Sequence, residues 1–544
     1  MMSMQARFLP FLIAASLPAQ VSYDRLLHAA EEPHNWLTYS GSYMSQRYSP
    51  LGRITPQNVK TLEQKWVYQV ESLQKLETSP LAVDGVLYIT QPPNDVIAID
   101  GRTGRAFWIY QYRPAPEAKP CCGFVNRGLA ILNNTLFMAT IDAHLVAIDA
   151  TSGTLLWNTK VADHALGYAM TLAPLVVKDK VVVGVAGGEY GIRGFIAAYD
   201  ASSGKEAWRF YTIPGPGEPG HDTWPAGDSW QHGGASIWVT GSFDPELNLT
   251  YWGIGNPGPD WNPAQRTGAN LYSDSAVALD ADTGSLKWHF QFSPNDPYDY
   301  DSVQVPVLVD APWNGAVRKL MLWANRNGFF YALDRTNGKF LSGHPFVKVN
   351  WASGLDDSGK PIPTPQPAGA ATYPGVQGGT NWYSPSYSPR TGLFYVSAWE
   401  DYASVFVPEQ VEYSPGQRFT GGRPVSPIPG SPNPGLRGAP INRATEAAGH
   451  GAVLALDIVT GRRKWQFEMT DVTDSGILTT ASDLLFTGGR EGYFQALDAR
   501  TGALLWKANV GGPVSAAPIT YEIDGKQYVA IAGGHALFVY GLRE

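Results

Sequence analysis

The sequence predicts an all-β fold, an eight-bladed β-propeller. Of the 544 residues, 58 are glycine, 42 are proline and 18 are tryptophan, a turn-rich composition typical of large β proteins. An apolar run that ends in Asp and continues through Thr-Gly to Trp recurs along the chain. Repeated units of about four strands arranged radially make a propeller.

The repeated motif reads Ala-x-Asp-x-x-Thr/Ser-Gly-x-x-x-Trp. An apolar strand ends at the Asp, the Thr-Gly pair turns the chain, and the Trp lies on the returning strand, where we expect it to be buried between neighbouring units. Six copies retain the Trp: Asp100–Trp108, Asp149–Trp157, Asp200–Trp208, Asp280–Trp288, Asp457–Trp465 and Asp498–Trp506. A seventh copy, Asp334 to Gly338, lacks it.

The eighth unit has no complete motif. A gap of 123 residues separates Asp334 from Asp457, and it contains an apolar run at 392–397, which we count as the eighth unit. The strand near Trp66 is expected to close the ring with the last unit, 527–541. We therefore expect residues 20–544 to form a single propeller domain.

Four insertions interrupt the repeats and are rich in glycine, proline and aromatic residues. They span 211–235, 255–275, 341–385 and 405–447. Loops on one face of a propeller usually build its functional site, so we expect the site there.

Residues 1–19 have the pattern of a secretory signal peptide. Arg7 precedes an apolar run, and the segment ends at the small residue Ala19. The alternative is an apolar N-terminal tail without a targeting role. The net charge of −8, without a basic run, argues against nucleic acid as a partner. The signal peptide leads us to expect a periplasmic protein. No apolar run reaches the length of a membrane span.

The only two cysteines, Cys121 and Cys122, are adjacent. No Cys-x-x-Cys-His motif occurs, so no c-type haem is expected. Export would permit a disulfide between the two, although neighbouring Cα atoms lie closer than ordinary disulfide geometry allows. Constrained bonds of this kind mark functional sites more often than structural ones. The alternative is an incidental pair of reduced thiols.

The segment from Pro294 to Ser302 contains three carboxylates, Asp296, Asp299 and Asp301. If it is extended, Asp299 and Asp301 project to the same side. Two carboxylates on one side repel unless a proton or a cation lies between them. A solvated acidic turn is the simpler alternative, but the rest of the chain favours a cation site with a catalytic base.

Four motifs make the chain resemble the pyrroloquinoline quinone (PQQ) dependent alcohol dehydrogenases of the methanol/ethanol dehydrogenase type. They are Cys121-Cys-Gly-Phe-Val-Asn-Arg-Gly, Gly187-Gly-Glu-Tyr-Gly, Gly255-Asn-Pro-Gly and Asp299-Tyr-Asp. The resemblance runs from Asn35 to the C-terminus and implies an eight-bladed fold, in agreement with the repeat count.

The resemblance also implies a cofactor site. PQQ would lie flat between a Cys121–Cys122 disulfide and the indole of Trp238, an arrangement that orients a planar ring without covalent attachment. Polar contacts are implied for Glu77, Arg127, Thr171, Gly187, Gly188 and Arg326. Asn381 and Trp382 match a further motif on the cofactor side.

The same resemblance implies a metal bound by Glu189, Asn256 and Asp299, because oxygen ligands suit a hard cation. Asp301 stands where the calcium enzymes have a small or neutral residue. An added carboxylate favours a lanthanide(III) ion, with Ca²⁺ as the alternative. Asp299 would be the general base and Arg326 would steady the developing charge, while a primary alcohol passes a hydride to PQQ and becomes an aldehyde.

Two departures from methanol dehydrogenase, near Trp399 and at Ser475-Gly476, favour ethanol and longer alcohols over methanol. Electrons are expected to pass to a separate acceptor, a soluble cytochrome c, and a homodimer remains open. A PQQ-dependent polyol or sugar dehydrogenase is an alternative function. A non-catalytic propeller scaffold is another, although such scaffolds lack the cysteine pair and the Asp-Tyr-Asp element.

Overall fold

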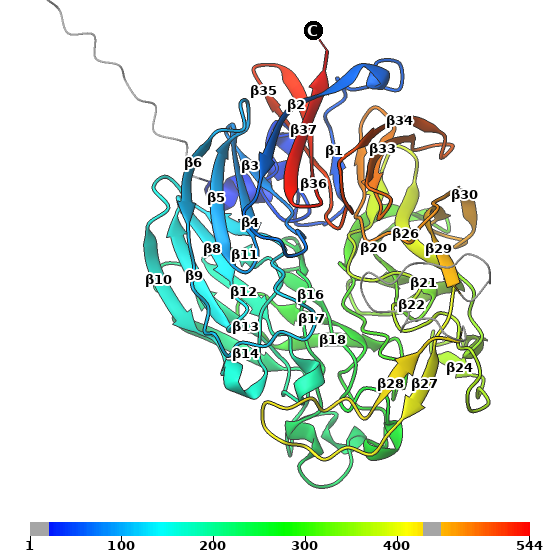
Figure 1. Ribbon diagram of the computed structural model, residues 1–544. Coiled ribbons are helices and arrows are strands. Elements are labelled where there is room, and N and C mark those ends of the chain that lie inside the picture. Colours follow the sequence, from blue (N-terminus) through cyan, green and yellow to red (C-terminus); the bar gives the residue numbers. More distant parts are fainter. Residues whose placement is uncertain (1–20, 428–447, 544) are drawn as a thin grey trace, which may run out of the picture.

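The computed structural model describes residues 21–427 and 448–543. The predicted signal peptide and part of the 405–447 insertion lie outside these residues. Eight four-stranded antiparallel sheets are arranged around a central axis, as predicted (Figure 1). One of them carries a fifth strand, β1 (Tyr48–Ser49), which pairs in parallel with β31.

The first four blades follow one another along the chain. Their strands are β3 (Leu81–Val83), β4 (Val86–Gln91), β5 (Asp95–Asp100), β6 (Ala106–Tyr110); β7 (Ala130–Leu132), β8 (Thr135–Ala139), β9 (His144–Asp149), β10 (Leu155–Lys160); β11 (Leu175–Val177), β12 (Lys180–Gly184), β13 (Phe195–Asp200), β14 (Glu206–Tyr211); β15 (Ser242–Asp244), β16 (Leu249–Gly253), β17 (Ser275–Asp280) and β18 (Leu286–Gln291).

The remaining blades include the two that depart from this order. Their strands are β19 (Val307–Trp313), β20 (Ala316–Ala324), β21 (Phe329–Asp334), β22 (Phe340–Pro345); β25 (Ser386–Ser388), β26 (Leu393–Tyr402), β29 (Ala448–Asp457), β30 (Arg463–Glu468); β31 (Leu478–Thr480), β32 (Leu484–Gly488), β33 (Tyr493–Asp498), β34 (Leu504–Asn509); and β35 (Ile519–Ile523), β36 (Lys526–Gly533), β37 (Ala536–Leu542) with β2 (Leu62–Gln69).

Elements outside the blades are short. Two hairpins, β23 (Ala352–Leu355) with β24 (Pro361–Pro363) and β27 (Val405–Pro408) with β28 (Gly422–Val425), lie in the insertions. The single α-helix of the described residues is α1 (Tyr23–Leu27). The 3₁₀ turns are η1 (Ala29–Glu31), η2 (Val59–Thr61), η3 (His164–Leu166), η4 (Gly188–Tyr190), η5 (His221–Thr223), η6 (Ser229–Gln231) and η7 (Pro263–Gln265).

The count of eight blades is confirmed, but our assignment of the eighth unit is wrong. The run at 392–397 lies mainly in β26, which pairs with β29, so it belongs to the blade whose turn begins at Asp457. The long 405–447 insertion separates these two paired strands in sequence. The eighth blade consists instead of β35, β36, β37 and β2.

Ring closure through the Trp66 strand is confirmed. Strand β2 pairs antiparallel with β37, with Trp66 opposite Val539, and Figure 1 shows the blue and red strands side by side. Because the outer strand of this blade comes from the N-terminal part of the chain, its docking tryptophan is Trp66, which donates a hydrogen bond to the Gly101 carbonyl of the first blade at 3.1 Å.

The tryptophans of the repeat join neighbouring blades. Trp108 donates its indole N–H to the Ala150 carbonyl at 3.2 Å, directly after the motif Asp of the next blade. Its ring covers Gly153, whose φ is +73°, and a Cβ there would lie 2.7 Å from the ring. Only glycine therefore satisfies both the turn and the contact. Trp157, Trp208, Trp288 and Trp465 repeat the hydrogen bond, to Ala201, Ala281, Arg335 and Ala499.

The prediction that all six motif tryptophans are buried is correct only for Trp208 and Trp288. The other four are partly exposed, although each packs against a hydrophobic core cluster. Trp506 packs edge-on against Tyr540, since the last blade offers no Thr-Gly turn. At the copy without Trp, His344 covers Gly461 of the next blade.

Candidate active site

A cavity of about 340 Å³ lies where loops from most of the blades converge. Its wall includes nearly all of the predicted site residues: Glu77, Cys121, Cys122, Arg127, Thr171, Gly187, Glu189, Trp238, Asp299, Asp301, Arg326, Asn381 and Trp382. Gly188 and Asn256 lie just outside the wall. Gly188 begins η4 next to Glu189, and the backbone of Asn256 contacts Asp301.

The insertions contribute unequally to this cavity. Residues of the 255–275, 341–385 and 405–427 segments line it, including Trp261, Gln377 and Arg418. Among the described residues, none of the 211–235 segment does, so the expectation that this insertion builds the site is wrong.

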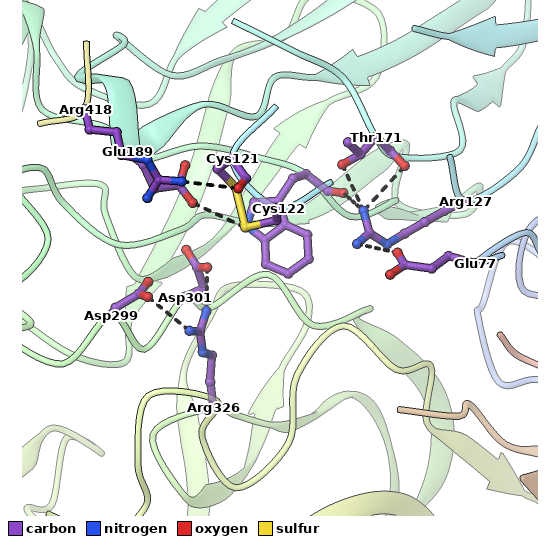
Figure 2. Close-up of a disulfide and its surroundings, with 11 residues drawn as sticks. Glu77, Cys121, Cys122, Arg127, Thr171, Glu189, Asp299, Asp301, Arg326 and Arg418 are labelled. Carbon is purple, nitrogen blue, oxygen red and sulfur yellow. Dashed lines mark hydrogen bonds and ion pairs between the residues drawn. A yellow bond between two sulfur atoms is a disulfide. The ribbon is translucent and has the colours of Figure 1, made fainter. Parts of the chain in front are cut away.

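Cys121 and Cys122 form a disulfide at the cavity wall, as predicted (Figure 2). The Cys122 Sγ lies 3.9 Å from Oε1 of Glu189, and Arg418 donates a hydrogen bond to the Cys121 carbonyl at 3.4 Å. The disulfide therefore lies next to the carboxylate of Glu189, as Figure 2 shows.

One end of the cavity is basic and aromatic. Arg127 donates to Thr171 Oγ1 at 2.8 Å and its Nη2 lies 2.8 Å from Glu77 Oε2. Its guanidinium carbon lies 5.0 Å from the ring centroid of Trp238 and 4.6 Å from that of Trp382. This end offers positive charge beside flat aromatic surfaces, which suits a planar anionic ligand.

Three further charged residues at this end were missed by the sequence analysis. Lys75 Nζ lies 3.3 Å from Glu77 and 3.1 Å from Asp474, and Arg490 Nε lies 3.1 Å from Asp474. Burial alone would raise the pKa of Asp474, but Lys75 and Arg490 outweigh it and lower that pKa. Lys75 is far from Asp474 and Arg490 in the sequence, so no motif spacing could have indicated this cluster. It forms only when the propeller ring closes.

The other end of the cavity is acidic. Arg326 donates from Nη1 to Asp301 Oδ2 at 2.6 Å and from Nη2 to Asp299 Oδ2 at 3.2 Å (Figure 2). Burial raises the pKa of Asp299 well above its usual value, against the opposing effect of Arg326. Burial also raises the pKa of Glu189, and the charge of Asp301 adds to that shift. A bound cation would relieve both shifts.

The Asp-Tyr-Asp segment is not extended, so the condition under which strand alternation would place Asp299 and Asp301 on the same side is not met. Asp299 has a left-handed backbone, with φ of +61°, and no strand covers 294–302. The carboxylate of Asp296 accepts the N–H groups of Tyr298 and Tyr300 at 3.0 and 2.6 Å and so organises a turn. Arg326, rather than strand alternation, brings the carboxylates of Asp299 and Asp301 together.

Asp260 is a fourth carboxylate at this end, and it was not predicted. It is 1% exposed and lines the cavity, and neither of its carboxylate oxygens has a hydrogen-bond partner in the described part of the chain. Burial raises its pKa well above the usual value, with Glu189 and Asp301 adding to the effect. Its position four residues after Asn256, in a Gly- and Pro-rich loop, was the available signal.

Comparisons with known proteins agree with this arrangement. The PQQ family model described as "Glucose/ethanol/alcohol dehydrogenase, beta-propeller domain" matches residues 36–353 and 468–529. The chain is 38% identical to quinoprotein alcohol dehydrogenase PedH of Pseudomonas putida, covering 96% of this chain and 90% of that protein. The chain belongs to the family of PQQ-dependent alcohol dehydrogenases.

One further relative and one solved structure are similar to this alcohol dehydrogenase along most of its length. A 1-butanol dehydrogenase (cytochrome c) of Thauera butanivorans is 39% identical, over 92% of this chain and 74% of that protein. A solved structure of a europium-containing methanol dehydrogenase superposes with a TM-score of 0.88 at 32% identity, covering 95% of this chain and all of that one. The predicted fold and family are thus confirmed, and the scaffold alternative is excluded.

The cavity of this PQQ-dependent dehydrogenase fits both implied groups. The cations and indoles around Arg127 match a flat tricarboxylate such as PQQ. The unpartnered oxygens of Asp260, beside the other three carboxylates, match a hard cation.

The residues at the two departures from methanol dehydrogenase do not line the cavity. Trp399 is 2% exposed and donates its indole N–H to the Thr473 carbonyl at 2.8 Å. Ser475 and Gly476 are buried behind Asp474, which itself lines the wall. Any effect of these positions on alcohol choice would therefore act through the wall residues.

Proposed function

We propose that this dehydrogenase oxidises primary alcohols, ethanol and longer ones in preference to methanol, to aldehydes with Asp299 as the general base. The observation that carries this proposal is the position of Asp299, whose carboxylate lines the cavity and contacts Arg326. Burial strengthens the carboxylate as a base, and Arg326 keeps it oriented. Bound PQQ supplies the quinone that accepts the hydride of the alcohol.

The residues assigned to hold PQQ divide by type of contact. The Cys121–Cys122 disulfide and Trp238 would face the two sides of its ring. Arg127, with its Glu77 and Thr171 partners, would bind a carboxylate, and Arg326 would reach the quinone end. Gly187, Gly188, Asn381 and Trp382 complete the assigned set. Support comes from the cavity wall, which contains all of these except Gly188.

A metal ion assigned to Glu189, Asn256, Asp299 and Asp301 supplies a Lewis acid beside the quinone. A lanthanide(III) ion is favoured over Ca²⁺ because three of these residues are carboxylates that line one cavity. The europium in the similar methanol dehydrogenase structure supports this choice.

Transfer of electrons to a separate cytochrome c is the proposed next step. The sequence contains no Cys-x-x-Cys-His motif, and a relative is described as a cytochrome c linked butanol dehydrogenase. None of the helices in the described part of the chain is both long and apolar enough to cross a membrane. From the predicted signal at 1–19 we infer that the reaction takes place in the periplasm.

The test is reconstitution of the purified protein with PQQ and either Ca²⁺ or La³⁺, followed by assay of a panel of alcohols, polyols and aldoses with an artificial acceptor. We expect turnover of ethanol and longer primary alcohols, highest with La³⁺. If polyols or aldoses are turned over preferentially, the proposed substrate class is wrong. If activity is equal with Ca²⁺ and La³⁺, the lanthanide assignment is wrong.

A further inference from the structure

Asp260 lines the cavity wall, and neither of its carboxylate oxygens makes a hydrogen bond of normal distance and angle among residues 21–427 and 448–543. The side-chain amide of Asn256 and the charge of Arg266 act on it and partly offset the effect of burial on its pKa. Its side chain is almost fully buried, and both oxygens are sequestered from solvent. Burying a carboxylate without a hydrogen bond or counter-charge is unfavourable. A group held in this way is stabilised either by a proton or by a bound cation.

The adjacent buried arginine does not supply that charge through a direct bond. Arg266 donates to the backbone carbonyls of Pro259, Asp260 and Asp296 and to the side chains of Asn270 and Asn295. No ion pair joins its guanidinium to the Asp260 carboxylate within the described residues. The arginine thus shapes the loop, while the Asp260 carboxylate stays unpaired next to the cavity.

The loop that carries Asp260 also carries Asn256. Asp260 and Glu189 both line the cavity, and the carboxylate charges of Glu189 and Asp301 act on Asp260. Asp301 differs from Asp260 because both of its oxygens are already engaged, Oδ1 by the Asn256 N–H at 2.9 Å and Oδ2 by Arg326. Neither oxygen of Asp260 is engaged in this way.

We propose that Asp260 is an additional ligand of the metal site and raises its selectivity for trivalent over divalent ions. The inference rests on the metal site of the proposed function and extends it by one residue. A fourth carboxylate strengthens attraction for any cation, and the gain grows with the charge of the ion. Ligand charge count also tunes affinity in oxygen-ligand sites.

The test compares the PQQ-loaded wild type with Asp260→Asn by tryptophan-sensitised Tb³⁺ luminescence, with Ca²⁺ as the competitor. Trp238 and Trp261 line the cavity and provide the sensitising indoles. We expect the Tb³⁺ affinity of the variant to fall by on the order of tenfold or more, as for other groups that support a metal site. Its Ca²⁺ affinity should fall less, so that the Tb³⁺/Ca²⁺ ratio decreases.

Thermal unfolding gives a second readout of the same variant. Without metal, Asp260→Asn should be at least as stable as wild type, because an unpaired buried carboxylate has been removed. The rise in Tm on addition of La³⁺ should be smaller than in wild type. If Asp260→Asn fails to fold, Asp260→Ser removes the same charge and is measured in its place.

Asp274→Asn is the matched control. Asp274 is fully buried and both of its oxygens lack partners among the described residues, but it does not line the cavity. A Tb³⁺/Ca²⁺ ratio unchanged in Asp260→Asn, or lowered equally in Asp274→Asn, overturns the inference while the proposed metal site stands. If the wild-type protein binds Ca²⁺ more tightly than Tb³⁺, both the role proposed for Asp260 and the lanthanide assignment are wrong.

Discussion

Arg326 Nη1 lies 2.6 Å from Oδ2 of Asp301, the second acidic residue of the Asp-Tyr-Asp element, and both residues line the cavity. The same guanidinium contacts Asp299 and donates twice to the Val376 carbonyl. Asp301 therefore has two effects on the site, since it adds negative charge and holds Arg326 in place.

The first prediction concerns the charge of Asp301. Asp301→Ala should lose La³⁺-supported activity selectively, because the site loses a carboxylate that a trivalent ion balances better than Ca²⁺. Turnover after reconstitution with PQQ and each metal is the measurement. Asp301→Asn serves as a control, since it removes the charge but keeps an acceptor for Arg326. Wild-type enzyme fully active with Ca²⁺ and unimproved by La³⁺ would contradict the prediction.

The second prediction concerns the base. Asp299→Asn should retain PQQ while kcat falls by at least ~10², because the amide cannot take the proton of the alcohol. Absorbance of the purified protein reports cofactor content, and steady-state kinetics report turnover. If the PQQ-loaded variant turns over at nearly the wild-type rate, the base is another residue.

The third prediction concerns the disulfide. Cys122→Ser should impair activity far more than stability, since a bond between adjacent residues closes almost no loop. Turnover and Tm are compared between the variant and wild type. Thiol titration of active wild type provides the control, and two free thiols in fully active enzyme would contradict a functional disulfide.

The fourth prediction concerns the docking of blades. Trp157→Ala should destabilise the fold, and the buried Trp208→Ala should do so by more, about 3–5 kcal/mol. Trp208→Phe keeps most of the ring but loses the hydrogen bond to Ala281, so about 1 kcal/mol is expected. Denaturant unfolding measures both. Equal stability of wild type and Trp208→Ala would show that the ring does not join the blades.

The fold was predictable because its signal is local. Each Asp-x-x-Thr-Gly turn is stabilised within a few residues, as in the bonds that Asp149 accepts from the N–H groups of Thr151 and Ser152. Because the tryptophan follows the turn at a constant spacing, it contacts the corresponding turn of the next blade in most of the repeats. The exception was the eighth blade, because its outer strand is separated from the other three by the whole chain.

Sequence alone determined the repeats, the adjacent cysteines and, through family motifs, 13 of the residues that line the cavity. Only the tertiary structure decided how those residues are paired. The turn at Asp299, the sharing of Arg326, the Lys75–Asp474 contact and the unpartnered Asp260 all depend on loops from different blades. The energy of an interaction between charges falls with their separation and rises with burial. The separation and burial of these side chains are set only when the propeller ring closes.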